Sequence, residues 1–387
     1  MTDSAAASRL QSPETIRERC ENIFRAGLEG ELEHFEVHLE HLPAVKREVL
    51  EVTRRTYPDG RIPYHGRFRH FQAGGIDRLR LLEEKLAGLP EEEKRRARIE
   101  LVATSVLLDA GAGPTWRYRE ADTGLVFSRS EGLAVASFHL FLSGALSHEP
   151  GRPCQATAEG LQSVSSDVLA RGFQVSGANL LVGVEGRAAL LRSLAPAMAE
   201  HPEIFGRPPR LGDLCGSRDR KVAAREILAA ILEGFESIWP SRLTLDGKNL
   251  GDVWSHPKAG LVPFHKLSQW LTYSLIEPLE GSGVEVRGVD ALTGLAEYRN
   301  GGLFLDLGVL RPKHREVTDE AHEPGSGVVV EWRALTVALL DRLAETVGLP
   351  LVKALEGGTW RAGRVVAERL RRDGASPIRV LSDGTVF

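Results

Sequence analysis

The sequence predicts a mainly α-helical protein with a few short strands. Apolar residues recur at helical spacing over long stretches, as in residues 91–108, where Ile99, Val102 and Val106 stand at positions i, i+3 and i+7. Acidic residues open that stretch, which suits the positive end of a helix dipole, and Gly111 follows it as a stop signal. Runs with the alternation or the β-branched content of strands are short and few.

The remaining elements follow from the same patterns in chain order. Helices are expected over residues 13–30, 31–42, 43–56, 158–170, 185–199, 221–238, 263–277 and 334–347. Strands are expected over residues 284–286, 328–332 and 378–381, and the turn signal Asp383-Gly384 predicts a hairpin that continues to residue 386. Breaks rich in Pro and Gly, at residues 148–154, 202–216 and 313–327, lack the composition of flexible linkers. We therefore expect one large unit over residues 1–387, or two lobes with a soft boundary near residues 200–220.

Composition describes an ordinary soluble protein. The chain is 42% hydrophobic and 26% charged with a net charge of −4, so nothing in its charge favours a nucleic-acid partner. Residues 1–12 do not read as a signal peptide, and no apolar run approaches the roughly 20 residues that span a bilayer. Cys20, Cys154 and Cys215 lie far apart, which predicts neither a cysteine-based zinc site nor a disulfide framework. We expect a cytoplasmic protein without membrane or nucleic-acid partners, and a homo-oligomer is left open.

The best candidate for a polar site is residues 296–310, Ala-Glu-Tyr-Arg-Asn-Gly-Gly-Leu-Phe-Leu-Asp-Leu-Gly-Val-Leu. Acids and arginines among such apolar residues are costly to bury unless they pair or act on a ligand. Glu297 and Asp306 are nine residues apart, so one continuous helix would turn their carboxylates about 180° away from each other. If Gly301-Gly302 breaks the helix, both acids could converge on a ligand. Alternatively, at least one acid forms a structural ion pair with Arg299 or with Arg333 of the charged cluster that follows.

Residues 107–115, Leu-Leu-Asp-Ala-Gly-Ala-Gly-Pro-Thr, allow two interpretations. They mimic the Asp-x-Gly-x-Gly turn of S-adenosylmethionine-dependent methyltransferases and, less closely, the pyrophosphate loop of phosphoribosyltransferases. Both loops need a strand before them, whereas the preceding residues have helical periodicity. A Gly-rich helix C-terminus explains the glycines but not Asp109, which either lines a pocket with Trp116 or caps the surface.

Two basic segments could bind a phosphate. Residues 64–71 interleave basic and aromatic side chains, so Arg67 and Arg69 could grip a phosphate while a ring covers the ligand. The plainer interpretation is that these arginines are solvated or paired with acids of residues 83–93. Lys266 stands near the start of an expected helix, where a phosphate seat and an ordinary exposed first turn are both open.

Three histidines have a spacing that a metal ion could use. On the helix expected over residues 31–42, His34, His38 and His41 would share one face, where their imidazoles could bind zinc. The same stretch carries an apolar stripe with interspersed glutamates, which favours an ordinary amphipathic helix with its histidines at the polar edge. We therefore expect no metal at the site.

Several motifs carry a family resemblance. Residues 62–71, Ile-Pro-Tyr-His-Gly-Arg-Phe-Arg-His-Phe, followed by Gly-Gly-Ile-Asp-Arg at 74–78, resemble the uracil-catabolism proteins of fungi and bacteria, a family with a domain of unknown function. Residues 246–254, Asp-Gly-Lys-Asn-Leu-Gly-Asp-Val-Trp, resemble the same family. The likeness extends over nearly the whole chain.

A more distant resemblance is to the queuosine-salvage N-ribosyl hydrolases. Residues 296–310 resemble their Ala-Asp-Tyr-Arg-Val-Pro-Gln and Leu-Gly-Val-Leu segments, and residues 325–334 resemble Gly-Ser-x-x-Glu-Val-Glu-Ile-Arg-Ala. Residues 266–269 resemble Lys-Arg-Ala-Gln, and Asp109 with Trp116 is similar to Asp-Ser-Leu-Asn-Phe-x-Phe-Trp. Glu297 stands where those hydrolases carry Asp.

Together these resemblances imply a reaction. They imply a DNA-glycosylase-like helical fold and an N-ribosyl hydrolase that splits a ribosylurea 5′-phosphate, or a related nucleotide of uracil breakdown, into urea and ribose phosphate. Such cleavage passes through an oxocarbenium-like state and needs a carboxylate near the anomeric carbon, but neither a metal nor an organic cofactor. The alternatives are a phosphoribosyltransferase and a non-catalytic nucleotide-binding protein.

The expected roles follow the same resemblance. Asp306 or Glu297 is the expected catalytic carboxylate, with Asp109 as a further candidate. The expected substrate-binding residues are Arg299 and Arg333 for the acids or the sugar phosphate, Lys266 and Gln269 for the phosphate or urea, Trp116, Tyr298 and Trp332 for the pocket walls, and Glu331, Arg67 and Arg69.

Overall fold

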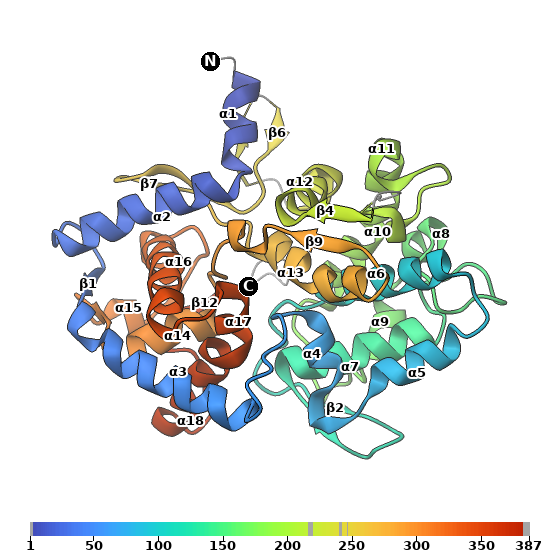
Figure 1. Cartoon of the computed structure of the whole chain (residues 1–387), viewed down its shortest axis with the longest axis horizontal. Coiled ribbons are helices and arrows are strands. Elements are labelled where there is room, and N and C mark those ends of the chain that lie inside the picture. The colour runs from blue at the N-terminus through green and yellow to red at the C-terminus, as the bar shows by residue number, and fades with distance from the viewer. Residues whose placement is uncertain (1–2, 216–219, 240–241, 246, 382–387) are drawn as a thin grey trace. The chain divides into compact units, whose positions relative to one another are not determined.

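A computed structural model describes residues 3–215, 220–239, 242–245 and 247–381. The chain divides into two compact units, each assembled from separate stretches of sequence (Figure 1). Unit 1 comprises Met1–His65, Arg242–Gln269 and Gly288–Leu381, and unit 2 comprises Gly66–Ser241, Trp270–Arg287 and Ser382–Phe387. Whether these units correspond to the one large unit or the two lobes expected from the sequence stays a prediction.

Helices dominate both units, which confirms the mainly α-helical class, whereas the DNA-glycosylase-like type of fold stays a prediction. Within the described ranges the strands are short and join in pairs. The elements of unit 1 are α1 (Asp3–Leu10), α2 (Pro13–Leu28), β1 (Phe35–Val37), η1 (Leu39–His41), α3 (Leu42–Thr56), β5 (Thr244–Leu245), β6 (Lys248–Asn249), β7 (Val253–His256), β8 (Gly260–Pro263), η5 (Val289–Ala291), α14 (Tyr298–Asp306), β10 (Leu310–Pro312), α15 (Glu316–Asp319), β11 (Ala321–His322), α16 (Gly327–Val347), α17 (Leu351–Ala354), the π-helical turn η6 (Leu355–Thr359), α18 (Trp360–Leu370) and β12 (Arg379–Val380).

The elements of unit 2 are α4 (Arg67–Phe71), η2 (Ala73–Gly75), α5 (Arg78–Lys85), α6 (Glu91–Leu107), β2 (Tyr118–Arg119), β3 (Val126–Phe127), α7 (Arg129–Leu142), α8 (Ala158–Gln162), α9 (Ser166–Gly172), α10 (Val184–Glu200), α11 (Pro202–Phe205), η3 (Leu211–Asp213), β4 (Lys221–Ala223), α12 (Ala224–Gly234), η4 (Glu236–Ile238) and β9 (Glu285–Arg287). Helix α13 (Lys266–Glu280) starts in unit 1 and continues in unit 2.

Helix α16 forms the centre of unit 1. Its side chains are buried around the whole helix for most of its length, so it must be covered on all sides. Figure 1 shows that α2, in blue near the N-terminus, and α16, in orange-red, lie side by side. The hydroxyl of Ser326 caps the first turn by accepting from the N–H of Val329, and Gly348 ends the helix at a φ of 71°.

Helix α6 has the corresponding place in unit 2. Its residues from Ile99 to Leu107 are all buried, and it packs against α7, α10 and η3. The expected helix over residues 91–108 is therefore confirmed. It ends directly before Asp109, so no strand precedes the Gly-rich loop, and the interpretation of that loop as a helix C-terminus is confirmed.

Other expected elements are confirmed within a few residues, namely α2, α3, α10, α13, β9 and β12. The helix expected over residues 158–170 is instead two helices, because Ser165 caps a new start at α9. The helix expected over residues 221–238 begins with a strand, β4, which pairs in parallel with β9. The hairpin expected within residues 382–386 lies outside the described residues.

Two expectations are wrong. Residues 328–332 are not a strand but the first turns of α16, because burial on all sides outweighs the strand preference of three consecutive valines. Residues 31–42 are not a helix, because Phe35–Val37 pair antiparallel with Leu310–Pro312 and bury Phe35 completely.

Candidate active site

In unit 1, Glu297 is the residue at which helix α14 begins. Its backbone is extended, and its carboxylate accepts hydrogen bonds from the N–H of Arg299 at 2.8 Å and of Asn300 at 2.6 Å. The residue is only 9% exposed. The positive end of the helix dipole favours the ionised form of such a carboxylate. Glu297 is therefore a fixed, buried acid.

The paired glycines of α14 lie inside the helix and do not end it. Helix α14 continues through Gly301 and Gly302, so the structure has the continuous helix of the two arrangements considered from the sequence. A Cβ atom at position 301 would lie 2.6 Å from Nε1 of Trp332 and 2.7 Å from the hydroxyl of Thr336. Glycine thus lets α14 approach α16 closely. Because α14 is continuous, Glu297 and Asp306 lie at opposite ends of a helix about 14 Å long.

Asp306 is held by an arginine that lies outside the motifs of the sequence. Its two carboxylate oxygens accept from Nη1 and Nη2 of Arg371 at 2.7 and 2.6 Å. The partners expected for this acid have other contacts. Arg299 donates to the carbonyl of Gly374 at 2.8 Å, and its guanidinium lies 4.8 Å from the ring centre of the half-buried Tyr298.

Arg333 of α16 forms an ion pair with Asp252. Its two terminal nitrogens donate to the two oxygens of Asp252 at 2.7 and 2.8 Å, and its guanidinium lies 4.1 Å from the ring centre of Phe264. Asp252 also accepts from the backbone N–H of Lys266 at 3.0 Å and from Nε1 of Trp254 at 2.8 Å. Burial raises the pKa of Asp252, but the charge and hydrogen bonds of Arg333 outweigh it, so the net pKa is well below its usual value. Asp252 is in the family-like segment 246–254, but no local sequence pattern indicated Arg333 as its partner. Asp246, in the same segment, lies outside the described residues.

The other expected residues of unit 1 hold backbone segments together. Glu331 accepts from the N–H groups of Glu33 and His34 at 3.1 and 3.0 Å, which fixes the chain just before β1. Gln269 accepts from the N–H of Thr293 at 2.9 Å. Trp332 is 2% exposed and packs against α14 at Gly301. Whether any of these side chains binds a substrate stays a prediction.

In unit 2, Arg67 and Asp109 form a second buried cluster. Arg67 is fully buried and donates to Oδ2 of Asp109 at 2.7 Å and to the hydroxyl of Ser105 at 2.7 Å. Ser130 donates to the same carboxylate oxygen at 2.7 Å. Burial lowers the pKa of Arg67, and the nearby carboxylate of Asp109 opposes that shift. From the sequence we expected that Arg67 could bind a phosphate, and nothing there indicated Asp109 as its partner.

A second arginine shapes the loop that carries Asp109. Arg187 of α10 donates to the backbone carbonyls of Leu108, Ala110 and Gly111 at 3.1, 2.7 and 3.1 Å. Burial lowers its pKa to about 10, although Asp109 opposes the shift. These bonds satisfy backbone carbonyls of the loop that follows α6.

The remaining two expected residues of unit 2 have other partners. Arg69 donates to Glu277 at 2.9 Å rather than to an acid of residues 83–93. Trp116 is fully buried, and its Nε1 donates to the carbonyl of Phe173 at 2.9 Å, as a core tryptophan does.

The expected histidine face does not exist, because residues 31–42 are not helical. Nδ1 of His34 lies 3.1 Å from Nε2 of His314, His38 contacts Glu36 and Glu40, and His41 lies 3.0 Å from a guanidinium nitrogen of Arg311. The three imidazoles thus have separate partners.

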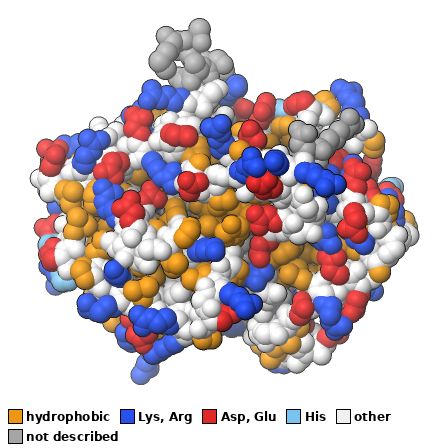
Figure 2. All heavy atoms as spheres, viewed as in Figure 1, with side chains coloured by type: hydrophobic (Ala, Val, Ile, Leu, Met, Phe, Trp, Pro, Cys, Tyr) orange, Lys and Arg blue, Asp and Glu red, His pale blue; other side chains and the backbone are white. Residues whose placement is uncertain are grey.

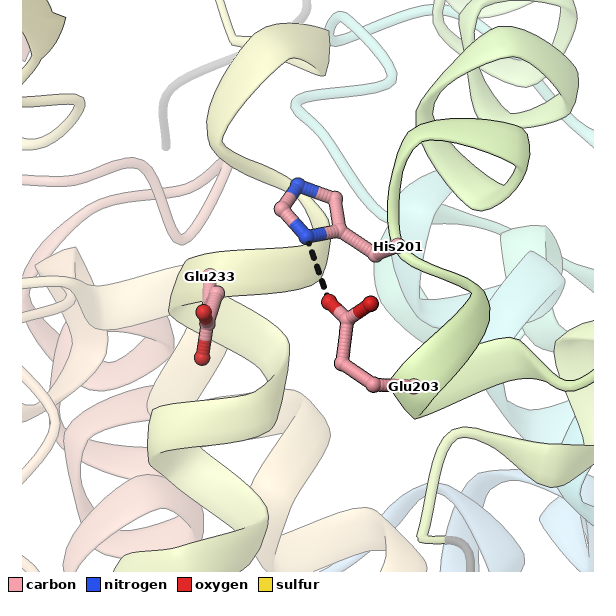
Figure 3. Close-up of side chains that lie close together, drawn as sticks. All are labelled: His201, Glu203 and Glu233. Carbon is pink, nitrogen blue, oxygen red and sulfur yellow. Dashed lines mark hydrogen bonds and ion pairs between the residues drawn. The ribbon is translucent and has the colours of Figure 1, made fainter.

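Within the described part of the chain, another group has side chains that a metal ion could use: His201, Glu203 and Glu233 of unit 2 (Figure 3). The two glutamates are exposed, and Nδ1 of His201 is 3.0 Å from Glu203. Their ligand atoms lie within 4.8 Å of one another. Exposed groups of this kind are common without a metal, so the cluster supports no metal chemistry on its own.

The charged side chains on one face of the molecule are mixed in sign. On the face that Figure 2 shows, positive and negative side chains are interspersed rather than gathered by sign. Among the described residues, no helix has the length and apolar content needed to cross a bilayer.

Comparison with known proteins gives matches over the full length. A family described as protein of unknown function (DUF1688) matches residues 9–387. Uracil catabolism protein 4 of Lachancea kluyveri is 38% identical over 444 aligned residues that cover 100% of both chains. Protein urg3 of Schizosaccharomyces pombe is 39% identical over 401 aligned residues that cover 98% of both chains.

Proposed function

The chain belongs to the family of proteins of unknown function DUF1688, and from that premise we propose that it acts in uracil catabolism as an N-ribosyl hydrolase. Its proposed substrate is a ribosylurea 5′-phosphate, or a closely related nucleotide, and its products are urea and ribose phosphate. The name of the relative from Lachancea kluyveri supports the pathway, and the resemblance of residues 296–310 to the queuosine-salvage hydrolases supports the reaction.

The observation that carries the proposal is the position of Glu297. It stands where those hydrolases carry Asp, and backbone N–H groups at the start of α14 hold both of its oxygens. A carboxylate fixed in this way keeps its charge and direction without reorganising during the reaction. That suits an acid that stabilises an oxocarbenium-like state or takes a proton from the attacking water.

The other two candidate acids suit this role less well. Arg371 binds both oxygens of Asp306, and Arg67 binds Asp109 inside unit 2. A guanidinium at that distance offsets much of the charge that would stabilise a developing cation. We therefore propose Glu297 as the catalytic carboxylate.

The experiment is a urea-release assay with the purified full chain and ribosylurea 5′-phosphate. The proposal predicts urea and ribose 5-phosphate in equal amounts. Absence of both, at enzyme and substrate concentrations where binding is saturated, would contradict the hydrolase. Turnover that requires pyrophosphate would identify a phosphoribosyltransferase instead, and binding without turnover would identify a nucleotide-binding protein.

A further inference from the structure

We propose that His65 is the proton donor to the leaving nitrogen and that Glu356 and Tyr57 position it; this inference rests on the N-ribosyl hydrolase function proposed above. The three side chains belong to unit 1. His65 stands in the family-like segment 62–71, whereas Glu356 and Tyr57 lie outside every motif of the sequence.

The three residues form one hydrogen-bonded group. Nδ1 of His65 lies 2.8 Å from Oε2 of Glu356, and the hydroxyl of Tyr57 donates to Oε1 of Glu356 at 2.6 Å. The backbone N–H of His65 donates to the carbonyl of Val352 at 3.2 Å. Each oxygen of the Glu356 carboxylate thus has a partner. His65 is held through both its backbone N–H and its ring.

The side chains of His65 and Glu356 are both buried and in contact. Glu356 is 4% exposed and His65 is 3% exposed. A carboxyl group at that depth needs a polar partner, and the imidazole of His65 at 2.8 Å is one. The guanidinium of Arg361 is farther away, at 3.9 Å, and its side chain is 44% exposed. With Nδ1–H directed to Glu356, the transferable proton is the one on Nε2, as in other carboxylate–histidine pairs.

The backbone around Glu356 forms a π-helical turn, a conformation that is common at functional sites. Glu356 lies on this turn, η6, between α17 and α18, and π turns are otherwise rare. Two glycines follow Glu356. A Cβ atom at Gly358 would lie 2.4 Å from a methyl carbon of Val49, and one at Gly357 would lie 3.2 Å from a methyl carbon of Thr53. These glycines let η6 lie directly on α3, whose C-terminal end carries Tyr57.

Hydrogen bonds join the π turn that carries Glu356 to the first turn of α14. Thr359, the last residue of η6, donates from its hydroxyl to Oδ1 of Asn300 at 2.9 Å. The backbone N–H of Asn300 in turn donates to Glu297. The π turn and the N-terminus of α14 are therefore fixed against each other within unit 1. From this connection we infer that His65 acts in the same reaction as Glu297.

The proposed step balances as follows. The oxygen of a water molecule bonds to the anomeric carbon, and Glu297 takes the proton that this water loses. The carbon–nitrogen bond breaks, its electron pair goes to the urea nitrogen, and the Nε2 proton of His65 neutralises that nitrogen. Proton exchange with solvent then restores both side chains, so the net reaction consumes only water.

Two substrates with different leaving groups test this role. Urea nitrogen is a poor leaving group that needs a proton, whereas nitrophenolate leaves from 4-nitrophenyl ribofuranoside 5-phosphate without one. We expect His65→Gln to lower kcat on ribosylurea 5′-phosphate by roughly 10²-fold or more and on the nitrophenyl substrate by less than about threefold. The ratio of the two rates is independent of how much of the variant is folded.

Glu356→Gln tests the positioning role through the pH profile. A general acid must be protonated, so activity falls as the pH rises through its titration. Removal of the carboxylate charge makes the imidazolium less stable, so we expect this fall to begin at lower pH in Glu356→Gln than in the wild type. Tyr57→Phe is the matched smaller change and should shift the profile less.

The outcomes separate the two proposals. A wild-type protein that cleaves neither substrate overturns the hydrolase itself. A wild-type protein that cleaves both, with His65→Gln equally impaired on both, overturns the acid role of His65 and leaves the hydrolase standing. An unshifted pH profile in Glu356→Gln overturns its positioning role.

Discussion

The two ends of helix α14 hold their carboxylates in opposite ways. At its start, Glu297 accepts from two backbone N–H groups, and at its last residue Asp306 is bound on both oxygens by Arg371. A guanidinium supplies a full positive charge that stays in place at any physiological pH. The acid at the start of α14 is thus held in direction, whereas the acid at its end is held and neutralised.

The same distinction applies to three other acids of the chain, of which Glu356 is buried and Asp252 and Asp109 are partly buried. Asp252 and Asp109 are bound by Arg333 and Arg67, as Asp306 is by Arg371. Glu356 instead forms hydrogen bonds with an imidazole and a phenol, groups that can donate a proton or exchange one, and the guanidinium of Arg361 lies farther away at 3.9 Å. Burial alone therefore does not identify a catalytic acid, and the chemical nature of its partner is more informative.

The largest effect is expected for Glu297→Gln. Glutamine keeps the shape and can still accept a hydrogen bond, but it carries no charge to stabilise an oxocarbenium-like state. We expect kcat for urea release to fall by roughly 10²-fold or more. The weaker helix cap should cost only about 1 kcal/mol of stability. Urea release and thermal unfolding of the same preparation measure both effects.

The control for this prediction is the other end of the helix. If Glu297→Gln keeps wild-type turnover while Asp306→Asn loses it, the assignment of roles along α14 is reversed. If both variants keep it, Asp109 becomes the first acid to test.

Gly301→Ala is expected to have the next largest effect, on stability. A methyl group at this position would overlap Nε1 of Trp332, at 2.6 Å, and push α14 away from α16. Such overpacking typically costs about 1–3 kcal/mol. Gly302→Ala is a matched control, because the nearest atom there is a ring carbon of Pro377 at 3.1 Å. Equal unfolding free energies for the two variants, from denaturant titration, would contradict the packing role of Gly301.

Asp306→Asn should lose about 1–2 kcal/mol, because it removes the negative partner of Arg371. The side chain of Arg371 is 27% exposed, so water can partly replace the lost partner and the cost stays below that of a fully buried pair. Turnover per folded molecule should not change. A variant with wild-type stability and lost turnover would show that Asp306 is catalytic.

Helices were predictable from the sequence where a charged first turn begins them or apolar residues recur at helical spacing. Helix α6 was located correctly because charged residues open it and Ile99, Val102 and Val106 recur at helical spacing, although its second half is buried. Helix periodicity failed at residues 328–332, where three valines look like a strand but are buried within a helix. Burial on all sides removes the polar face that would have revealed the helical period.

Some residues of the candidate site were predictable from the sequence, but their partners were not. Acids among apolar residues marked Glu297 and Asp306 as unusual, since each needs a partner when buried. The partners themselves come from distant parts of the chain, as Arg371 does for Asp306 and Glu356 does for His65, and no local pattern points to them. Gly301-Gly302 was visible as a motif, but its function depends on Trp332 of another helix.

A smaller effect is expected from pH. The pKa of Asp252 is below its usual value because Arg333 outweighs the effect of burial. A carboxyl whose folded pKa is lowered contributes stability above its unfolded pKa, about 3.9, and loses it as the pH falls below that value. The free energy of unfolding of the wild type should therefore fall more steeply below about pH 4 than that of Asp252→Asn. Parallel curves for the two proteins, from denaturant titrations at several pH values, would contradict this coupling.

The smallest effect is expected from metal removal. Glu297 and His65 need no metal in the proposed reaction, and the group of His201, Glu203 and Glu233 is a separate, exposed cluster of unit 2 (Figure 3). Urea release should therefore be unchanged after exhaustive chelation and in His201→Ala. Turnover that chelation abolishes and zinc restores would contradict the proton-transfer mechanism. In that case His201→Ala decides the location: loss of zinc binding in the variant assigns the ion to this cluster, and unchanged zinc binding places it elsewhere in the chain.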